Sequence, residues 1–241
     1  MVERLNGVVL RTIKYSDTLM IADMYTQLYG RMSFLVPVSR SRRAKVRSVL
    51  FQPLSMLSFT ASVRQGKSLT RLSDVQPYAM FSTIPFDVTK SSVAVYLAEF
   101  LSYALQEDDE HEALFAYIDY ALHWFDGVQT GYSSFHILFL LHLTKFLGIC
   151  PNVENYTKGT YFDLVAGCLV SEPPAHRVFL SAEDTENFIQ LLSLDFPTLP
   201  TVSISRKARS EYLALIHTYY KLHIPDFPEL KSEEVLRELF S

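Results

Sequence analysis

The chain has 241 residues, of which 49% are hydrophobic, and a formal net charge of −4. This composition provides enough apolar residues for a packed core and excludes an intrinsically disordered chain. The charge is unevenly placed: residues 1–80 carry 12 Lys and Arg against 4 Asp and Glu, whereas residues 81–241 carry 10 against 22. This asymmetry predicts two domains with different functions, at residues 1–80 and 81–241.

The start of the chain and its cysteines indicate a cytoplasmic protein. The first residues lack the pattern of a secretory signal, and Cys150 and Cys168 are too few for a disulfide scaffold. The most apolar stretch, residues 135–147, is shorter than the roughly 20 apolar residues of a membrane span. We therefore expect a buried helix there and no contact with a membrane.

Residues 5–78 show short apolar runs separated by polar turns, which is typical of strands. The expected strands are residues 7–13, 19–26, 31–38, 50–62 and 68–78. Five short strands without a helical period predict a small antiparallel barrel. A five-stranded barrel of this size is the oligonucleotide-binding (OB) architecture. An SH3-like barrel is the alternative, and periodicity does not separate the two.

After residue 78 the apolar residues recur at helical spacing. The expected helices lie near residues 93–105, 114–125, 135–147, 181–192, 205–223 and 232–240. Gly148 is expected to end the third helix, and Ser181 and Ser232 to begin the fourth and the last. An irregular insertion, with a short hairpin within residues 161–170, is expected at about residues 149–180. This part is predicted to be an all-α domain with one irregular insertion.

The main chemical feature is the basic segment at residues 39–47, which reads SRSRRAKVR. Its cations are Arg40, Arg42, Arg43, Lys45 and Arg47. Arginine makes bidentate contacts with phosphates, and neutralised phosphates release counterions, so the segment predicts a nucleic-acid ligand. The alternative is a solvated loop without a ligand.

Other barrel residues extend this prediction. Further cations are Arg11, Lys14, Arg31, Arg64, Lys67 and Arg71. Tyr15, Tyr25, Tyr29 and Phe34 are aromatic candidates for stacking on bases, against the alternative that they belong to the core.

A second basic set lies on the helix expected at residues 205–223. It comprises Arg206, Lys207, Arg209 and Lys221. Cations at the start of a helix oppose its dipole, which favours an acidic partner as the reason for them. Ordinary surface charge is the alternative.

Signs of catalysis are missing from the sequence. It has no glycine-rich phosphate loop, no G-x-S-x-G motif and no C-x-x-C pair. The acidic run at residues 107–112 places carboxylates at the start of the next helix, which accounts for it without a metal. Two cysteines cannot alone fill a tetrahedral zinc site. We expect no enzymatic activity, no metal and no cofactor.

Several segments, taken in order, resemble a known family. Gly7-Val8-Val9-Leu10 is followed by Tyr15-Ser16-Asp17, by Tyr25-Thr26-x-x-Tyr29-Gly30, by the basic segment and by Phe51-Gln52-Pro53-Leu54. Phe146-Leu147-Gly148-Ile149-x-Pro151 precedes the insertion; Arg209, Leu222-His223 and Leu230-Lys231-Ser232 come later. Over essentially the whole chain, this order resembles the RecO family of bacterial recombination mediator proteins.

The resemblance implies an OB-fold barrel followed by a helical domain, in a non-catalytic protein of DNA repair and recombination. It implies binding of single- and double-stranded DNA, annealing of complementary strands, and help in loading the recombinase RecA onto strands coated by single-strand-binding protein. The implied partners are RecR and the acidic C-terminal tail of the single-strand-binding protein. The implied location is the bacterial cytoplasm, with association to the nucleoid during repair.

The chain departs from the family pattern at two places. Many members carry a four-cysteine zinc site in the insertion, but residues 152–159 hold no cysteine pair here. We therefore expect an insertion without zinc that is held by packing. Val38-Ser39 also stands where the family usually has a glycine just before the basic segment.

Together these observations give a DNA-binding hypothesis. Phosphate contacts are predicted for Arg31, Arg40, Arg42, Arg43, Lys45, Arg47, Arg64 and Lys67. A pocket near Arg206 and Arg209 is predicted to hold the tail of the single-strand-binding protein. One alternative is a protein-only adaptor whose basic loop binds an acidic partner. Another is a nuclease, which would need carboxylates clustered near the basic face.

Overall fold

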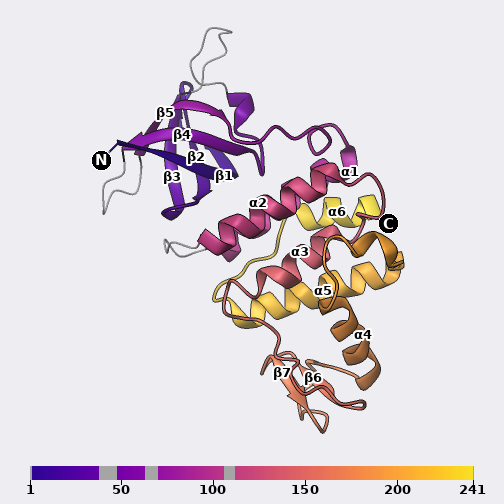
Figure 1. The fold of residues 1–241 in the computed structure, drawn as a ribbon. Helices are drawn as coiled ribbons and strands as arrows, with labels where there is room; N and C mark the ends of the chain where they lie inside the picture. The colour runs from indigo at the N-terminus through magenta and orange to yellow at the C-terminus, as the bar shows by residue number, and fades with distance from the viewer. Residues whose placement is uncertain (1, 38–47, 63–69, 106–111, 241) are drawn as a thin grey trace. The chain divides into compact units, whose positions relative to one another are not determined.

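The computed structural model describes residues 2–37, 48–62, 70–105 and 112–240 (Figure 1). These residues form two compact units. The first comprises Met1–Asp126 and Glu229–Leu239, and the second comprises Gly127–Pro228 with the last two residues. Three helices thus belong to the same unit as the barrel, and the domain boundary predicted after residue 80 stays a prediction.

The N-terminal strands close into the predicted five-stranded, OB-like barrel. They are β1 (Val2–Lys14), β2 (Leu19–Thr26), β3 (Gly30–Pro37), β4 (Met56–Ser62) and β5 (Thr70–Pro77), in the order β1-β2-β3-β5-β4. Four of the pairs are antiparallel. The closing pair differs from the prediction: β3 and β5 run parallel, with Phe34 opposite Thr70.

The fourth strand is shorter than the predicted residues 50–62. A short 3-10 helix, Ser48–Leu50, and a turn precede it, and pairing begins only at Met56. In the turn, Leu54 has a left-handed backbone (φ 59°), and its N–H donates to the carbonyl of Val9 at 2.8 Å. This hydrogen bond fixes the turn in a conformation that is not a strand. The apolar residues before Met56 therefore do not belong to β4.

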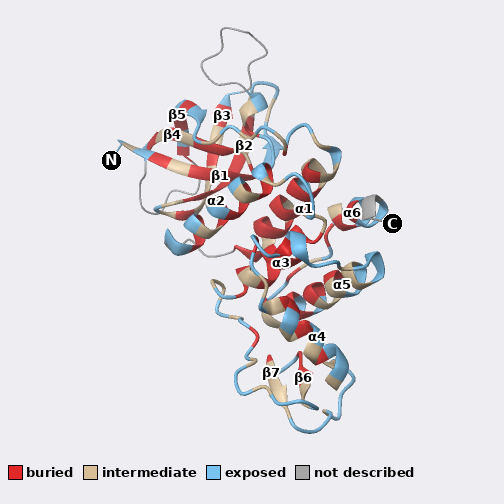
Figure 2. Ribbon diagram, turned by 45° about the vertical axis from the view of Figure 1, so that its right-hand side comes forward, coloured by how far each residue is buried: buried red, intermediate tan, exposed pale blue. Residues whose placement is uncertain are grey.

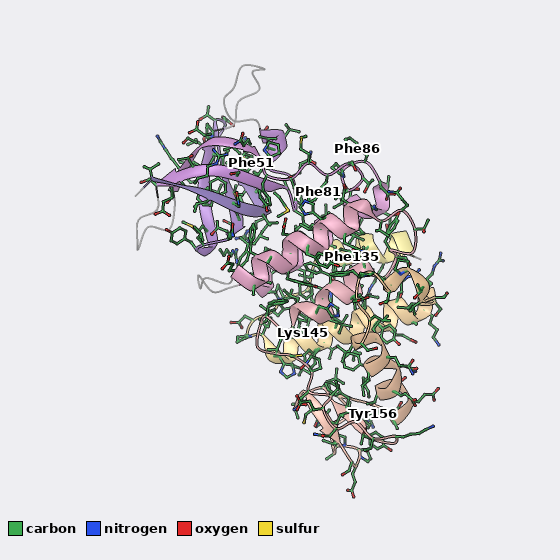
Figure 3. All side chains as sticks on the ribbon, in the orientation of Figure 1. Phe51, Phe81, Phe86, Phe135, Lys145 and Tyr156 are labelled. Carbon is green, nitrogen blue, oxygen red and sulfur yellow. The ribbon has the colours of Figure 1, made fainter. Side chains whose placement is uncertain are left out.

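Side chains that alternate along the strands fill the barrel. Its core is formed by Leu5, Val9, Met20, Ala22, Met24, Phe34, Val36, Phe51, Leu57, Phe59, Ala61, Leu72 and Val75 (Figures 2 and 3). The rings of Phe34 and Phe59 meet edge to face, with their centroids 4.9 Å apart. Phe34 and Tyr25 are both fully buried, so the alternative that they are interior residues holds for them and neither ring can stack on bases.

The helices of the first unit are α1 (Val88–Ala104), α2 (Glu112–Gly127) and α6 (Ser232–Phe240). Asp87 caps α1 by accepting the N–H of Lys90 at 2.9 Å. The predicted cap role of Ser232 is wrong, because Ser232 is already helical. The carboxylate of Glu99 on α1 instead accepts the N–H groups of Lys231 (3.1 Å) and Ser232 (2.8 Å).

The second unit contains α3 (Phe135–Leu143), α4 (Ala182–Leu192), α5 (Arg206–His223) and the 3-10 helix Leu199–Thr201. Its insertion forms a small sheet of β6 (Tyr161–Asp163), β7 (Cys168–Val170) and β8 (Phe179–Leu180). The predicted hairpin is the β6–β7 pair, whereas β8 was not predicted.

Of the predicted helix ends, the start of α4 is confirmed, whereas the third helix ends earlier than predicted. Ser181 caps α4 by accepting the N–H of Asp184 at 3.1 Å. The helix expected at residues 135–147 ends as α3 at Leu143 and continues as turns up to Gly148, whose left-handed backbone (φ 70°) suits a glycine. Within the described ranges, no helix is both long and apolar enough to cross a membrane.

Candidate nucleic-acid interface

Most of the cations predicted to bind DNA lie outside the described residues: Arg40, Arg42, Arg43, Lys45 and Arg47 in one segment, and Arg64 and Lys67 in another. The strand ends next to these segments are described. Pro37, before the first segment, pairs with Leu19 beside the C-terminal end of β1, whereas Ser62, before the second, pairs with Val2 at the N-terminal end of β1. The described residues Pro37 and Ser62 thus lie near opposite ends of β1.

Arg31 is the one predicted DNA-binding residue of the barrel that the structure describes, and its guanidinium contacts other parts of the protein. It donates to the carbonyl oxygens of Ser102 (2.6 Å) and Leu105 (3.3 Å) at the end of α1. A cation is favourable at the C-terminus of a helix. Arg31 therefore joins β3 to α1, and its contact with DNA stays a prediction.

Asp23 on β2 binds two arginines and a serine on the outer side of the barrel. Its buried carboxylate accepts from Ser33 Oγ (2.5 Å) and Arg11 Nε (2.5 Å), and it lies 3.4 Å from Arg31. Burial raises the pKa of Asp23, but the bonds from Ser33 and Arg11 and the two positive charges outweigh it and lower the pKa. The sequence analysis missed this arrangement, although an acidic residue within a basic barrel could have indicated it.

Helix α1 covers part of the outer face of the barrel. Val8, Leu10 and Tyr25 are absent from the barrel core and are nonetheless fully buried, and α1 contacts β1. This end of the face is therefore closed to a ligand. Further along β1 the face is open, because the side chain of Arg11 is 42% exposed and Ile13 is 45% exposed.

Of the four aromatic candidates for stacking, Tyr15 and Tyr29 retain accessible surface. Tyr15 is 62% exposed in the turn after β1. Tyr29 is half-buried, and its hydroxyl donates to the carboxylate of Glu3 at 2.6 Å. Tyr15 thus presents the more accessible ring.

The two cations predicted to bind a partner, Arg206 and Arg209, have different environments. Arg206 is exposed at the start of α5, whereas Arg209 is half-buried and donates to the carbonyl of Ile204 at 2.8 Å. Burial lowers the pKa of Arg209, and the charge of Arg206 lowers it further. Arg206 is available to an acidic partner, and the binding of such a partner stays a prediction.

Arg209 also lies near a buried histidine on α3. Burial lowers the pKa of His136 to about 3, and the charges of Arg209 and His217 contribute. His136 is therefore neutral at physiological pH.

The small sheet of the insertion is held by hydrogen bonds and aromatic packing. Asp163 accepts the N–H groups of Val165 (2.8 Å) and Ala166 (3.1 Å), and its other oxygen lies 3.3 Å from His176 Nε2. The rings of Phe162 and Phe188 pack with centroids 5.2 Å apart. In the part of the chain that the structure describes, no three His, Cys, Asp or Glu side chains are grouped to hold a metal ion.

Comparisons with known proteins cover nearly the whole chain. Residues 1–81 match the family model for the N-terminal domain of recombination protein O, and residues 85–234 match the model for its C-terminal domain. The chain is 44% identical to the DNA repair protein RecO of Phocaeicola vulgatus and 42% identical to that of Bacteroides fragilis, in each case over 100% of both chains. It is 28% identical to the RecO protein of Porphyromonas gingivalis over 97% of both chains. With its OB-like barrel and its helical region, the chain belongs to the RecO family of DNA repair proteins.

Proposed function

We propose that this protein is a non-catalytic recombination mediator that binds single- and double-stranded DNA through its N-terminal barrel. It anneals complementary strands and helps to load a recombinase onto DNA coated by single-strand-binding protein. The observation that carries the proposal is the charge of residues 1–80, which hold 12 basic and 4 acidic residues, in a member of a DNA repair family.

The basic segment at residues 39–47 supplies the main phosphate contacts in this proposal. Its members are Arg40, Arg42, Arg43, Lys45 and Arg47, with Arg64, Lys67 and Arg31 as flanking cations. Phosphate contacts carry no sequence information, so one basic surface accepts any strand. Two strands held on such a surface are close enough to test base pairing, which is the basis of annealing.

The acidic remainder of the chain is assigned to protein partners. Residues 81–241 carry 10 basic against 22 acidic residues and therefore repel DNA. The partners in this proposal are RecR and the acidic tail of the single-strand-binding protein, with RecA acting indirectly. The exposed Arg206 and its neighbour Arg209 are the proposed contacts of the acidic tail.

The test is binding of a fluorescent single-stranded oligonucleotide across a salt series. The variant Arg42→Glu/Arg43→Glu is compared with Lys158→Glu/Arg177→Glu, which makes the same charge change on exposed residues of the insertion. Loss of two phosphate contacts lowers the slope of log affinity against log salt by about 1.4, and the control leaves it unchanged.

The outcomes separate the candidate functions. An unchanged slope in the Arg42→Glu/Arg43→Glu variant refutes the placement of the site in the basic segment. No binding by the unmodified protein at low salt refutes the direct DNA role and favours the protein-only adaptor. Cleavage of the oligonucleotide on addition of a divalent metal would instead indicate a nuclease.

A further inference from the structure

Helices α1 and α6 border an open groove in the first unit, where α6 lies beside α1 (Figures 1 and 2). The groove has a volume of about 420 Å³. Its lining includes Ser91, Ser92 and Val95 of α1 and, at α6, Lys231 and Val235. The two helices run antiparallel, because Glu99 holds the start of α6 whereas Val95, one turn earlier on α1, lines the groove with Val235, one turn later on α6.

The polar groups of this groove are bound within the protein, with one exception. The hydroxyl groups of Ser91 and Ser92 donate to the carbonyl oxygen of Val88, at 3.0 and 2.8 Å. Both carboxylate oxygens of Glu99 accept backbone N–H groups at the start of α6. In the described ranges, the exposed ammonium group of Lys231 has no ion-pair partner. The groove thus presents apolar surface and one available cation.

Aliphatic side chains on both helices are exposed to water at this groove. Val95 is 47% exposed and Val235 is 54% exposed. Val88, two turns before Val95 on the same face of α1, is 70% exposed. Apolar side chains that lie together on a surface with polar residues around them are typical of a protein contact. The α1–α6 face therefore has the character of an interface.

The exposed face of α6 carries opposite charges on the two sides of Val235. Lys231 comes four residues before Val235 and Glu238 comes three residues after it, and all three residues are exposed. Residues at these spacings lie on the same face of a helix. When two such helices pack antiparallel, each Lys231 lies opposite Glu238 of the other helix, and the two valines meet between the charged pairs. The face is therefore complementary to itself in charge.

We propose that the α1–α6 face binds a second copy of this chain, with α6 of each copy in the groove of the other. A two-fold axis near Val235 relates the copies, so Val235 of one copy packs on Val95 of the other. Lys231 of each copy pairs with Glu238 of the other. This dimer does not depend on the proposed DNA binding, although under that function it would hold two barrels, and thus two strands, in one assembly.

The charge pattern favours a second copy over an unrelated partner. A groove with a single available cation fits many acidic helices, but this face also carries the matching carboxylate, at the spacing that an antiparallel copy requires. Helix α6 has nine residues and is therefore about 13 Å long. The contact is thus smaller than a standard interface of about 1,600 Å², and we expect a reversible dimer in the micromolar range.

The experiment is sedimentation velocity of the full chain, from about 1 to about 200 µM, a range that covers a dimer of this class. Val235→Glu places a carboxylate at the centre of the face. Val165→Glu makes the same change on an exposed valine of the second unit and is its control. Urea unfolding of each variant establishes that any loss of the dimer is not a loss of folding.

A charge exchange tests the orientation of the two copies. Lys231→Glu and Glu238→Lys each bring like charges together across the axis, whereas the combined variant restores opposite charges with the two residues exchanged. Lys158→Glu, on an exposed lysine of the insertion, is the control for a general charge effect.

Specific changes in dimer affinity are expected. Val235→Glu is expected to weaken the dimer at least about tenfold, and Val165→Glu to change it less than about twofold. Each single charge reversal is expected to weaken the dimer about threefold to fivefold, and the combined variant to return to within about twofold of the unmodified protein.

Other outcomes overturn this proposal. If the unmodified protein stays monomeric up to about 200 µM, no second copy occupies the face and the groove is left to a different protein. A dimer that Val235→Glu leaves intact forms through another surface. If the combined charge variant is weaker than both single variants, Lys231 and Glu238 do not meet across the axis and the antiparallel arrangement is wrong. Because no DNA is present in these experiments, each of these results leaves the proposed DNA-binding function unaffected.

Discussion

The carboxylate of Asp126, at the end of α2, holds the segment between the barrel and α1. It accepts the backbone N–H groups of Ser82 (2.8 Å), Thr83 (2.7 Å) and Ile84 (2.9 Å) and the two hydroxyl groups of that segment. The buried Lys90 donates to Thr83 Oγ1 at 2.7 Å and to the carbonyl oxygen of Asp126 at 3.1 Å. We expect Asp126→Asn to destabilise the first unit, because the amide presents an NH₂ group where the carboxylate presents an acceptor.

The size of this effect follows from the pKa of Asp126. Burial raises this pKa, but the N–H groups of Ser82, Ile84 and Thr83 and the Ser82 hydroxyl outweigh burial and lower it from 3.8 to about 2. That difference corresponds to about 2.5 kcal/mol in favour of the folded, ionised state. Because the folded pKa is below the unfolded one, this stability is complete above about pH 5. About half of it is lost at pH 3.

The assay is urea unfolding, monitored by the fluorescence of Trp124, the single tryptophan of the chain, which lies two residues from Asp126. Relative to the unmodified protein, Asp126→Asn is expected to lower the free energy of unfolding by about 2 kcal/mol at pH 7 and by about 1 kcal/mol at pH 3. Asp17→Asn is the matched control, because Asp17 has a 94% exposed side chain in a surface ion pair and should change stability little. A loss below about 0.5 kcal/mol at pH 7, or an equal loss at both pH values, would refute the reasoning.

Three further predictions concern the helices. Glu99→Gln is expected to lower the free energy of unfolding by about 1–2 kcal/mol and to speed hydrogen exchange in α6, because the N–H of Ser232 loses a charged acceptor. Unchanged hydrogen exchange in α6 would contradict this prediction. Gly131→Ala is expected to lower the free energy of unfolding by at least about 2 kcal/mol, as measured by thermal unfolding. The backbone at Gly131 is left-handed (φ 74°), and the new Cβ would lie 2.6 Å from Pro200 Cα. Because the folded pKa of His136 is about 3, below the usual 6.5, protonation favours unfolding and stability is lost as the pH falls below about 6.5. His136→Leu is expected to reduce this acid sensitivity in urea unfolding between pH 7 and pH 5; an equal loss in both proteins would exclude His136 as its source.

Local sequence determined most of the elements. Alternating apolar residues marked the strands, and apolar residues at helical spacing marked the helices, because side-chain direction follows from the backbone period. The start of α4 at Ser181 and the left-handed Gly148 were also predictable, since a cap or a turn depends on residues within one helical turn. The basic segment at residues 39–47 was evident from composition alone, and its contacts with DNA stay a prediction.

Contacts between residues far apart in the chain were decided only by the tertiary structure. The sequence carries no local signal that Arg31 would bind the carbonyl of Ser102, or that Glu99 would hold the start of α6 at Ser232. The cap predicted for Ser232 was wrong for this reason, because the acceptor comes from another helix. Cap rules consider only neighbours in sequence.

The outer face of the barrel shows the same division. The alternation of residues predicted which side chains leave the core, but it could not say which part of the outer face a helix would cover. Val8, Leu10 and Tyr25 are buried outside the barrel core and α1 contacts β1, whereas Ile13 is exposed. The parallel closure of β3 on β5 then brings Arg71 beside Leu35. Sequence thus determined the local conformation and the charge, whereas long-range packing decided which side chains remain accessible, because burial depends on elements that the chain reaches only after folding.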